Sequence, residues 1–264
     1  MAVKTTQTAL VTGCSEGALG FAIAQAFQAR GAHVFATARS PAKAAALAGL
    51  PNVTVLALDV TSDTSIREAL RVVTEHTGGR GELDYLVNNA GSQYVMSTLD
   101  LDIEVAKWMY EVNVWGVVAV IKAFAPLVVK AKGTIANLAS ISGLVRSPYM
   151  GVYAGSKSAC EAISEALRLE PRPFGVQVLT VIVGAVKSNI FANGPGYELP
   201  AGSHSGQRRR RAAREARGLR QKPRWRHDGR RDRYRRARQH VGLGSVRYCG
   251  VSAVTSRESA SNTS

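Results

Sequence analysis

The chain has 264 residues, which is enough for one large α/β domain or two small ones. Its formal net charge of +15 is uneven, because residues 204–264 hold 18 of the 34 lysines and arginines but only 4 of the 19 acidic residues. Three cysteines, far apart and without a C-x-x-C spacing, argue against a disulfide framework and against a zinc site.

Short apolar, β-branched runs alternate with longer helical patterns through most of the chain. Strands are expected at Thr8–Val11, His33–Ala38, Val53–Leu58, Leu83–Val87, Thr134–Leu138 and Val176–Val183. Helices are expected at Phe21–Arg30, Pro41–Ala48, Ser62–Thr77 (capped by Ser62 or Asp63), Ile103–Val129 and Gly151–Leu169. This alternation predicts an α/β fold: a single Rossmann-type domain whose doubly wound parallel sheet carries helices on both faces.

Two features bear on where the protein works. The polar segment Met1–Gln7 does not look like a signal peptide. The longest apolar stretch, near Val112–Ala131, is interrupted by Asn113, Lys122 and Lys130, and we expect it to be too broken to span a bilayer. The sequence therefore predicts a globular body in the cytoplasm, without a transmembrane segment.

A glycine-rich segment, Thr12–Gly20, follows the first predicted strand and opens the first predicted helix. Glycines let the backbone approach a pyrophosphate, and the free N–H groups of a helix N-terminus can bind its oxygens. The position favours a dinucleotide site, whereas the alternative is an ordinary strand-to-helix turn.

The end of the second predicted strand reads Ala38-Arg39-Ser40 and has no carboxylate. An acidic residue there would bind the ribose 2′-hydroxyl of NAD, whereas an arginine accommodates the 2′-phosphate of NADP. The sequence therefore predicts NADP(H) as the cofactor; the alternative is that Arg39 is a solvated loop charge.

Tyr153 and Lys157 are four residues apart in a predicted helix and therefore share one of its faces. An ammonium group beside a phenol favours the phenolate and lowers the pKa of the tyrosine. Such a tyrosine can donate a proton to a carbonyl oxygen and later take it back. Alone, the pair could equally be surface residues of an amphipathic helix.

Three features occur together in the expected order: the glycine loop, the segment Asn88-Asn89-Ala90-Gly91, and Ser140 placed thirteen residues before Tyr153. With them the chain resembles the short-chain dehydrogenase/reductase family over about residues 5–200. The segments Val34–Arg39 and Gly184–Ser188 are most similar to the fungal 1-acyldihydroxyacetone-phosphate-reductase-like branch. Hydroxysteroid dehydrogenases of the 17β type are a more distant likeness.

The resemblance implies a set of cofactor-binding residues. Glycines would form the loop, Ser15 and Arg39 would lie near the adenosine phosphate, and Asp59 with Val60 would meet the adenine. Asp59 could equally be a simple helix-entry residue. The implied set is Gly13, Ser15, Gly17, Gly20, Arg39, Asp59, Val60, Asn89, Ala90, Gly91, Tyr153, Lys157, Val186 and Ser188.

The resemblance also implies a catalytic set. Hydride would pass between the nicotinamide and a substrate carbonyl, whose oxygen Ser140 would bind and Tyr153 would protonate. Lys157 would lower the pKa of Tyr153 and hold the ribose hydroxyls, and Asn113 would anchor a water chain to Lys157. Ser142 and Ser147 compete with Ser140, but Ser140 lies at the end of the strand and has the family's spacing.

The glycine loop departs from the family pattern, since it is one residue longer than the commonest form. Either Gly17 is displaced, or Ala18 stands where relatives have their second glycine. In the second case, the methyl group of Ala18 would press toward the pyrophosphate and weaken cofactor binding. A second departure is Val183, which stands where the family usually has proline after the sixth strand.

The substrate is expected to lie against Gln93, Tyr94, the loop Ile141–Met150 and the segment after Val186. These positions are mostly apolar, which favours a hydrophobic ketone: a lipid, steroid-like or polyketide-like molecule. Pairing into a homodimer or homotetramer through the two long helices is what the family implies.

The helical and strand patterns stop after Leu199, and we place the domain boundary so that residues 1–202 form the domain and residues 203–264 an irregular basic tail. A solvated disordered tail is one interpretation, and an arm for nucleic acid or an anionic membrane surface is another. A third is an out-of-frame or unspliced coding sequence, since composition and family likeness change together. The competing functions are a working reductase, an impaired enzyme that binds cofactor only, and a nucleic-acid-binding protein on a dehydrogenase scaffold.

Overall fold

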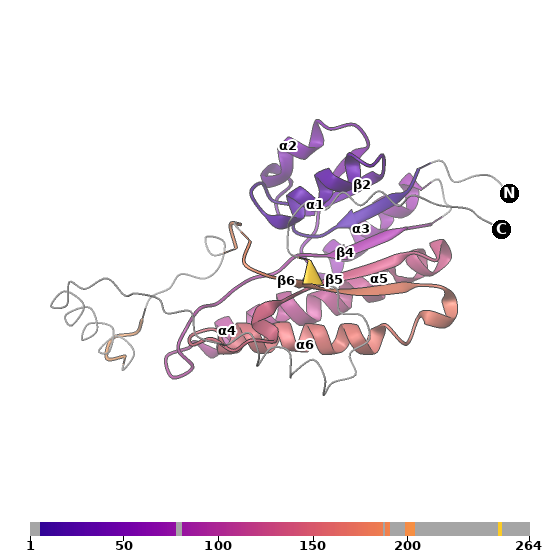
Figure 1. Cartoon of the computed structure of the whole chain (residues 1–264). Helices are drawn as coiled ribbons and strands as arrows, with labels where there is room; N and C mark the ends of the chain where they lie inside the picture. The colour runs from indigo at the N-terminus through magenta and orange to yellow at the C-terminus, as the bar shows by residue number, and fades with distance from the viewer. Residues whose placement is uncertain (1–5, 78–80, 187, 191–198, 204–247, 250–264) are drawn as a thin grey trace, which may run out of the picture.

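The computed structural model describes residues 6–77, 81–186, 188–190, 199–203 and 248–249. Its centre is a parallel sheet of seven strands in the order β3-β2-β1-β4-β5-β6-β7 (Figure 1). The order reverses beside β1, which confirms the doubly wound topology predicted from the sequence. The strands are β1 (Thr8–Val11), β2 (His33–Ala38), β3 (Val53–Ala57), β4 (Tyr85–Asn88), β5 (Thr134–Ser140), β6 (Gln177–Val183) and β7 (Tyr248–Cys249).

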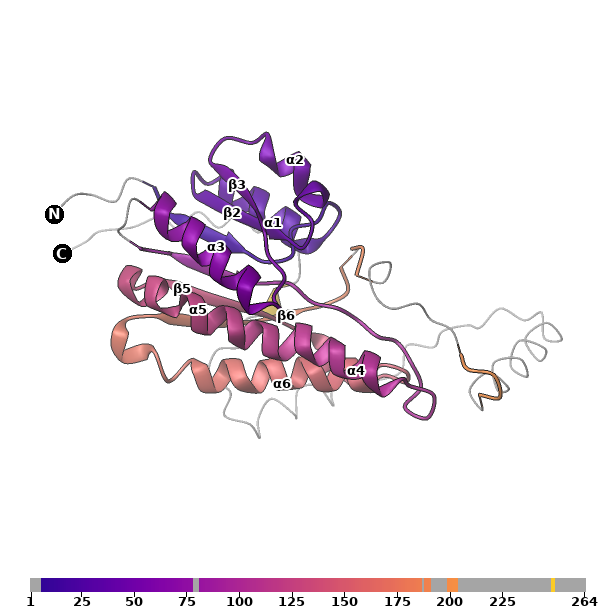
Figure 2. The same cartoon turned by 180° about the vertical axis from the view of Figure 1, so that it is seen from behind.

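Helices cover both faces of the sheet, as the alternating pattern predicts (Figures 1 and 2). The α-helices are α1 (Leu19–Gln28), α2 (Ala45–Ala48), α3 (Asp63–His76), α4 (Ile103–Tyr110), α5 (Gly116–Ala131) and α6 (Gly151–Leu167). A π-helical turn, η2 (Glu111–Trp115), joins α4 to α5. The 3₁₀ turns are η1 (Pro41–Ala44), η3 (Ile141–Gly143) and η4 (Arg172–Phe174).

Alternate strand residues supply two separate cores, because successive side chains of a strand point to opposite faces. Leu10 and Phe35 belong to the core under α3, α5 and α6, whereas Val11 and Val34 belong to the core under α1 and α2. The buried, apolar strands match the expectation for a parallel sheet covered on both faces.

The helical run through η2 behaves differently from the sequence expectation. By length and composition, an 18-residue window within Ile103–Ala131 is apolar enough to cross a bilayer, so Asn113, Lys122 and Lys130 interrupt the apolar stretch less than we expected. Half of that window is buried inside the fold, where α5 packs on α3, β4 and β5. Burial against the sheet explains the apolar composition of this helix.

The sheet edge at β6 shows a second difference. No strand was expected after Leu199, yet β7 pairs with β6 through Ile182↔Tyr248 and Val183↔Cys249. On the α1 side of β6, Leu179 remains 48% exposed.

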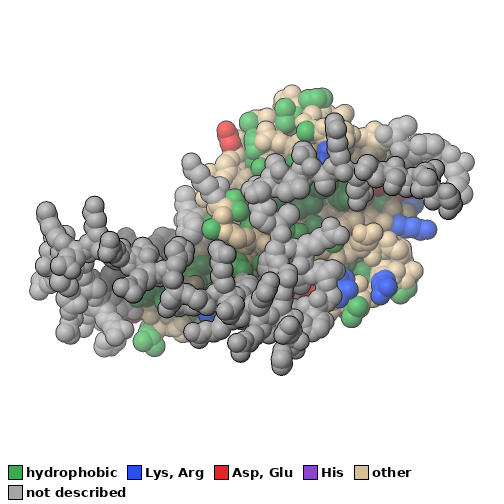
Figure 3. All heavy atoms as spheres, in the orientation of Figure 1, with side chains coloured by type: hydrophobic (Ala, Val, Ile, Leu, Met, Phe, Trp, Pro, Cys, Tyr) green, Lys and Arg blue, Asp and Glu red, His purple; other side chains and the backbone are tan. Residues whose placement is uncertain are grey.

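Figure 3, in the orientation of Figure 1, shows a described surface that is mostly uncharged, with Lys and Arg side chains at its right-hand edge. The basic stretch of the predicted tail lies outside the described residues.

A chain of buried amides joins the middle of the sheet to α6. Asn88 donates to Asn137 Oδ1 at 2.8 Å, and Asn137 donates to Ser164 Oγ at 2.9 Å. Because buried polar groups are costly without partners, these bonds favour one register of β4 and β5 under α6. The network thus fixes the helix that carries Tyr153 and Lys157 relative to the strand that ends at Ser140.

A pair of histidines, His33 at the start of β2 and His76 at the end of α3, makes the free energy of unfolding depend on pH. His33 shares a 3.0 Å hydrogen bond with Thr54 Oγ1, and its ring centroid lies 3.9 Å from that of His76. Burial, and then the charge of His76, lowers the pKa of His33 from 6.5 to about 4. The unfolded chain therefore binds this proton at a higher pH than the folded chain does.

We expect the contribution of His33 to stability to be complete above about pH 6.5 and to be lost as the pH falls toward 4. Because the ring is only half buried, the loss should be near 1 kcal/mol rather than the full value of the shift. Urea unfolding at pH 8, 6 and 5 measures it, and His33→Gln should show a smaller loss between pH 8 and 5. An equal loss in both proteins would contradict the assignment.

Candidate active site

The glycine loop between β1 and α1 forms a cradle that larger residues would fill. Gly13 and Gly17 have positive φ angles of 75° and 76°, which side chains other than glycine rarely adopt. A Cβ on Gly20 would lie 2.5 Å from the carbonyl oxygen of Gly13. The longer loop therefore keeps Gly17 at its turn, and Ala18 becomes the residue preceding α1 and lines the cavity. The loop and the helix N-terminus fit a pyrophosphate.

Residues after β4 hold this loop in place. Asn89 Nδ2 donates to the carbonyl oxygens of Thr12 at 2.7 Å and Gly13 at 3.1 Å. The Thr12 hydroxyl in turn accepts from the backbone N–H groups of Asn89 and Ala90, each at 2.9 Å. Asn89 is thus a positioning residue that links the first and fourth strands at their carboxyl ends, where ligands bind in this type of sheet.

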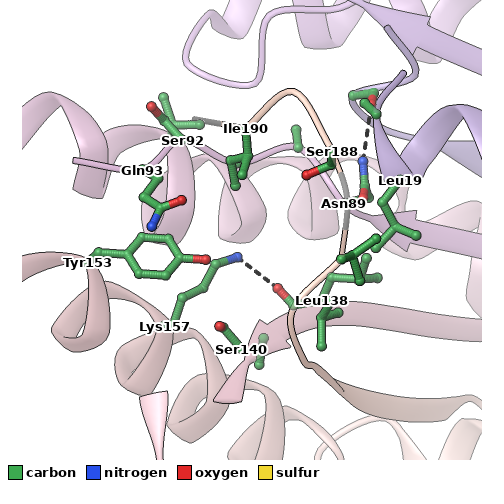
Figure 4. Close-up of a pocket in the computed structure, with 18 of the residues that line it drawn as sticks. Leu19, Asn89, Ser92, Gln93, Leu138, Ser140, Tyr153, Lys157, Ser188 and Ile190 are labelled. Atoms are coloured by element: carbon green, nitrogen blue, oxygen red, sulfur yellow. Dashed lines mark hydrogen bonds between the residues drawn. The ribbon is translucent and has the colours of Figure 1, made fainter. Parts of the chain in front are cut away.

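A cavity of about 390 Å³ lies along the carboxyl ends of the strands (Figure 4). It brings together most of the residues singled out from the sequence. Those lining it are Gly13, Ser15, Arg39, Asp59, Val60, Asn89, Ala90, Gly91, Ser140, Tyr153, Lys157, Val186 and Ser188. Gly17, Gly20 and Asn113 do not line it: the two glycines shape the loop, and Asn113 lies behind the wall.

One end of the cavity carries the groups expected to face the adenosine. Arg39 is exposed there, directly after β2. Asp59 Oδ1 accepts from the backbone N–H and the hydroxyl of Thr61, at 2.9 and 2.7 Å, so Asp59 also shapes the turn before α3. Asp59 therefore has both features: it shapes the entry to α3, and it lines the cavity.

Ser140, Tyr153 and Lys157 lie together at the other end. Ser140 ends β5, and its hydroxyl accepts from the N–H of Ser142 at 3.2 Å, while Tyr153 and Lys157 project from the first turns of α6. All three are at least nine-tenths buried. Figure 4 shows the Tyr153 hydroxyl directed toward the Lys157 ammonium, with Ser140 on the far side of them from Gln93.

The direction of the tyrosine pKa differs from the sequence expectation. Burial raises the pKa of Tyr153, and the facing Ser140 hydroxyl offsets this only in part. Burial also lowers the pKa of Lys157, whose ammonium donates to the Leu138 carbonyl oxygen at 2.9 Å. Tyr153 and Lys157 lie four residues apart in one helix, as predicted. The pKa of Tyr153 nevertheless rises, because both groups are removed from water and this desolvation outweighs the expected effect of the ammonium. Burial therefore favours the protonated form of the Tyr153 phenol.

Asn113 lies in η2 and is fully buried. Its side chain accepts from the N–H of Ser92 at 2.8 Å and donates to the Ser92 carbonyl at 2.8 Å and to Ser156 Oγ at 3.0 Å. These bonds use both N–H groups of the amide and one lone pair of Oδ1. The predicted proton relay stays a prediction, and the side chain acts as a clamp between the Gly91–Ser92 segment and α6.

Three contributors to the site were missed in the sequence. The Leu138 carbonyl holds Lys157, Ser156 supports Asn113, and Asn189 Nδ2 donates to the Glu16 carbonyl oxygen in the glycine loop at 3.1 Å. A Cβ on Gly17 would lie 2.5 Å from that same Asn189 nitrogen. No local pattern marks these contacts, except that Ser156 directly precedes Lys157 in the Tyr153–Lys157 motif.

Comparison with known proteins agrees with this geometry. The family model described as short chain dehydrogenase matches residues 7–195. A short-chain dehydrogenase of Penicillium ochrochloron, ptmH, is 47% identical over 197 residues, which are 75% of this chain and 71% of that protein. The chain belongs to the short-chain dehydrogenase family.

Two further proteins are similar to this chain, one in sequence and one in structure. An NADPH-dependent 1-acyldihydroxyacetone phosphate reductase of Schizosaccharomyces pombe is 42% identical over 183 residues, 69% of this chain and 60% of that protein. The X-ray structure of an alcohol dehydrogenase from the archaeon Thermococcus sibiricus, complexed with 5-hydroxy-NADP, aligns with a TM-score of 0.66 and 29% identity. That alignment covers 73% of this chain and 82% of the other.

Proposed function

We propose that this protein is an NADP-dependent reductase that transfers hydride between the nicotinamide and the carbonyl of a neutral, hydrophobic small molecule. The observation that carries the proposal is one cavity in which the glycine loop and Arg39 lie at one end and Ser140, Tyr153 and Lys157 at the other. The relatives named for NADPH and NADP support the choice of cofactor.

The bound dinucleotide would supply the hydride, and the residues of this chain would supply the rest. Gly13 and the α1 N-terminus would bind the pyrophosphate, and Arg39 the 2′-phosphate. The Ser140 hydroxyl would orient the carbonyl oxygen, and Tyr153, protonated because burial raises its pKa, would donate the proton to it. After Tyr153 has given up its proton, the Lys157 ammonium, held by the Leu138 carbonyl oxygen, would pass a proton to the phenolate and would take one back from solvent water.

The walls of the cavity support a neutral, hydrophobic substrate. The apolar side chains that line it include Trp108, Val112, Ile141, Met150 and Ile190, and Met150 packs in the same cluster as Tyr153. Among the described lining residues the charged ones are Arg39, Asp59 and Lys157, and only Lys157 lies beside Tyr153. A phosphate or carboxylate on the substrate would therefore lack a dedicated cationic partner there, whereas an apolar ketone would bury its surface favourably.

The test is NADPH and NADH oxidation by the full chain with neutral cyclic ketones, beside binding of NADPH followed by its fluorescence. We expect turnover that is faster with NADPH than with NADH. Binding of NADPH without turnover would instead support the impaired enzyme, and nucleic-acid binding that weakens with salt would support the third alternative. Equal rates with both cofactors would contradict the role of Arg39.

The domain boundary near residue 202, the cytoplasmic location and the self-association belong to the same proposal. The family match ending at residue 195 supports the boundary. Trp115 is 56% exposed on the outer side of the helical run Ile103–Ala131, which supports pairing through that run. Residues 204–247 and 250–264 lie outside the described residues, and translating the coding DNA near codon 203 in the other two frames tests whether they belong to the reading frame.

A further inference from the structure

Gln93 presents its amide to the cavity, and neither this amide nor the neighbouring Ser92 hydroxyl has an adequate hydrogen-bond partner in the described part of the chain. Each is 6% exposed, and both line the cavity beside Tyr153. The Ser92 hydroxyl is buried and has no partner in the described part of the chain. The amide of Gln93 has one hydrogen bond there, from Nε2 to the thioether sulfur of Met150 at 3.4 Å. A thioether is a weak acceptor, so two buried groups remain largely unsatisfied.

The backbone that carries these side chains is held from both sides. The N–H and carbonyl of Ser92 both bond the Asn113 side chain at 2.8 Å. Three residues beyond Gln93, the Met96 N–H donates to the Tyr149 carbonyl at 2.9 Å. The segment is therefore positioned before any ligand arrives, which is how binding groups avoid an ordering cost.

Figure 4 places Gln93 beside the Tyr153 ring, with Ser140 on the other side of that tyrosine. A molecule whose carbonyl reaches Ser140 and Tyr153 would thus extend past Gln93. Buried polar groups without protein partners favour a ligand that supplies the partners, since an apolar ligand would leave them unpaired.

We propose that Gln93 forms a second polar subsite that binds a hydroxyl group of the substrate, so that the preferred substrates are neutral hydroxyketones. This rests on the proposed function and names its substrate class. A hydroxyl both donates and accepts, so it satisfies the Gln93 amide in either orientation. The uncharged surroundings of the subsite exclude it as a carboxylate or phosphate site.

The experiment compares 2-tetralone with its four aromatic-ring hydroxy derivatives as substrates of the full chain with NADPH. We expect kcat/KM for at least one hydroxy derivative to exceed that of 2-tetralone by about tenfold, the usual effect of one good neutral hydrogen bond. In Gln93→Leu this ratio should fall close to one. The matched control is Gln25→Leu on the exposed side of α1, which should keep the wild-type ratio.

A binding measurement separates this inference from the reductase assignment. The protein saturated with NADPH is titrated by calorimetry with 2-naphthol and with dihydroxynaphthalenes, and the Kd ratio should again depend on Gln93. If no ketone is reduced but this ratio is retained, the reductase proposal fails and the subsite stands. If ketones are reduced with no hydroxyl preference, or if Gln93→Leu keeps the preference, the subsite is overturned.

Discussion

Replacing Tyr153 with phenylalanine is expected to lower kcat for NADPH-dependent ketone reduction by about 100- to 10,000-fold, the usual contribution of general acid catalysis. The ring packs with Tyr94, Met96 and Met109 in a buried cluster, and phenylalanine keeps that packing. The loss should therefore come from the missing proton donor, and the affinity for NADPH should change little. Steady-state kinetics and NADPH fluorescence titration measure the two quantities.

The control for this variant is Tyr110→Phe. Tyr110 precedes η2, and its hydroxyl lies close to Gly155 of α6 rather than in the cavity. That change should leave kcat within about threefold of wild type, because no proton transfer depends on the Tyr110 hydroxyl. If Tyr153→Phe behaved like Tyr110→Phe, Tyr153 would not be the donor.

The raised pKa of Tyr153 predicts different pH dependences of the rate for reduction and for oxidation. In the reduction direction the protonated phenol is the active form, so the rate should persist through neutral pH and fall only at alkaline pH. In the oxidation direction the phenolate is needed, so the rate should rise with pH. A pH–rate profile of kcat/KM in both directions with wild-type protein distinguishes these cases.

Replacing Arg39 with aspartate is expected to reduce the preference for NADPH over NADH by about 100-fold. Removing one charge-assisted contact to the 2′-phosphate costs about 1.5–3 kcal/mol, and the carboxylate adds repulsion. The same carboxylate can accept from the ribose 2′-hydroxyl of NADH. The readout is the ratio of kcat/KM values for the two cofactors with one ketone.

Arg30→Asp is the matched control, since Arg30 is exposed after α1 and bonds the Ala26 carbonyl on its own helix. It makes the same change in net charge away from the cavity, so it reports any general electrostatic effect. An unchanged cofactor ratio in Arg39→Asp would show that the 2′-phosphate binds elsewhere, and would remove the sequence argument for NADP.

Local patterns predicted the elements well because their causes are local. The strand Thr8–Val11 was placed at its observed ends, and the Ser62 hydroxyl caps α3, accepting from the Ser65 N–H at 3.3 Å, as one of the two expected caps. Helix periodicity did not reveal η2, since a π-turn shifts the hydrogen bonds by one residue without leaving a mark in composition. Gly116, the first residue of α5, lets the helix backbone lie close to Val60, since a Cβ on Gly116 would lie 2.7 Å from Val60 Cγ2.

Chemistry that depends on burial was harder to predict. The spacing of Tyr153 and Lys157 predicted a lowered tyrosine pKa, but the fold removes both groups from water and reverses the direction. The partners of Lys157 and Asn113 come from other elements, namely the Leu138 carbonyl of β5 and Ser92 after β4. Such contacts join residues about 20 apart in sequence, and no short motif encodes them.

The sequence by itself determined the doubly wound α/β fold, the family, and a set of site residues most of which line the cavity. It could do so because periodicity and short motifs reflect strand burial, turn geometry and helix faces. The tertiary structure decided in which direction burial shifts the pKa of Tyr153 and Lys157, which side chains hold neighbouring segments in place, and which polar groups lack partners among the described residues. The reason is physical: desolvation and hydrogen-bond satisfaction depend on every neighbour in space. Ser92 and Gln93 are two polar residues after a glycine in the sequence, and only the tertiary structure shows that, among the described residues, the Ser92 hydroxyl has no partner and the Gln93 amide bonds only the Met150 sulfur.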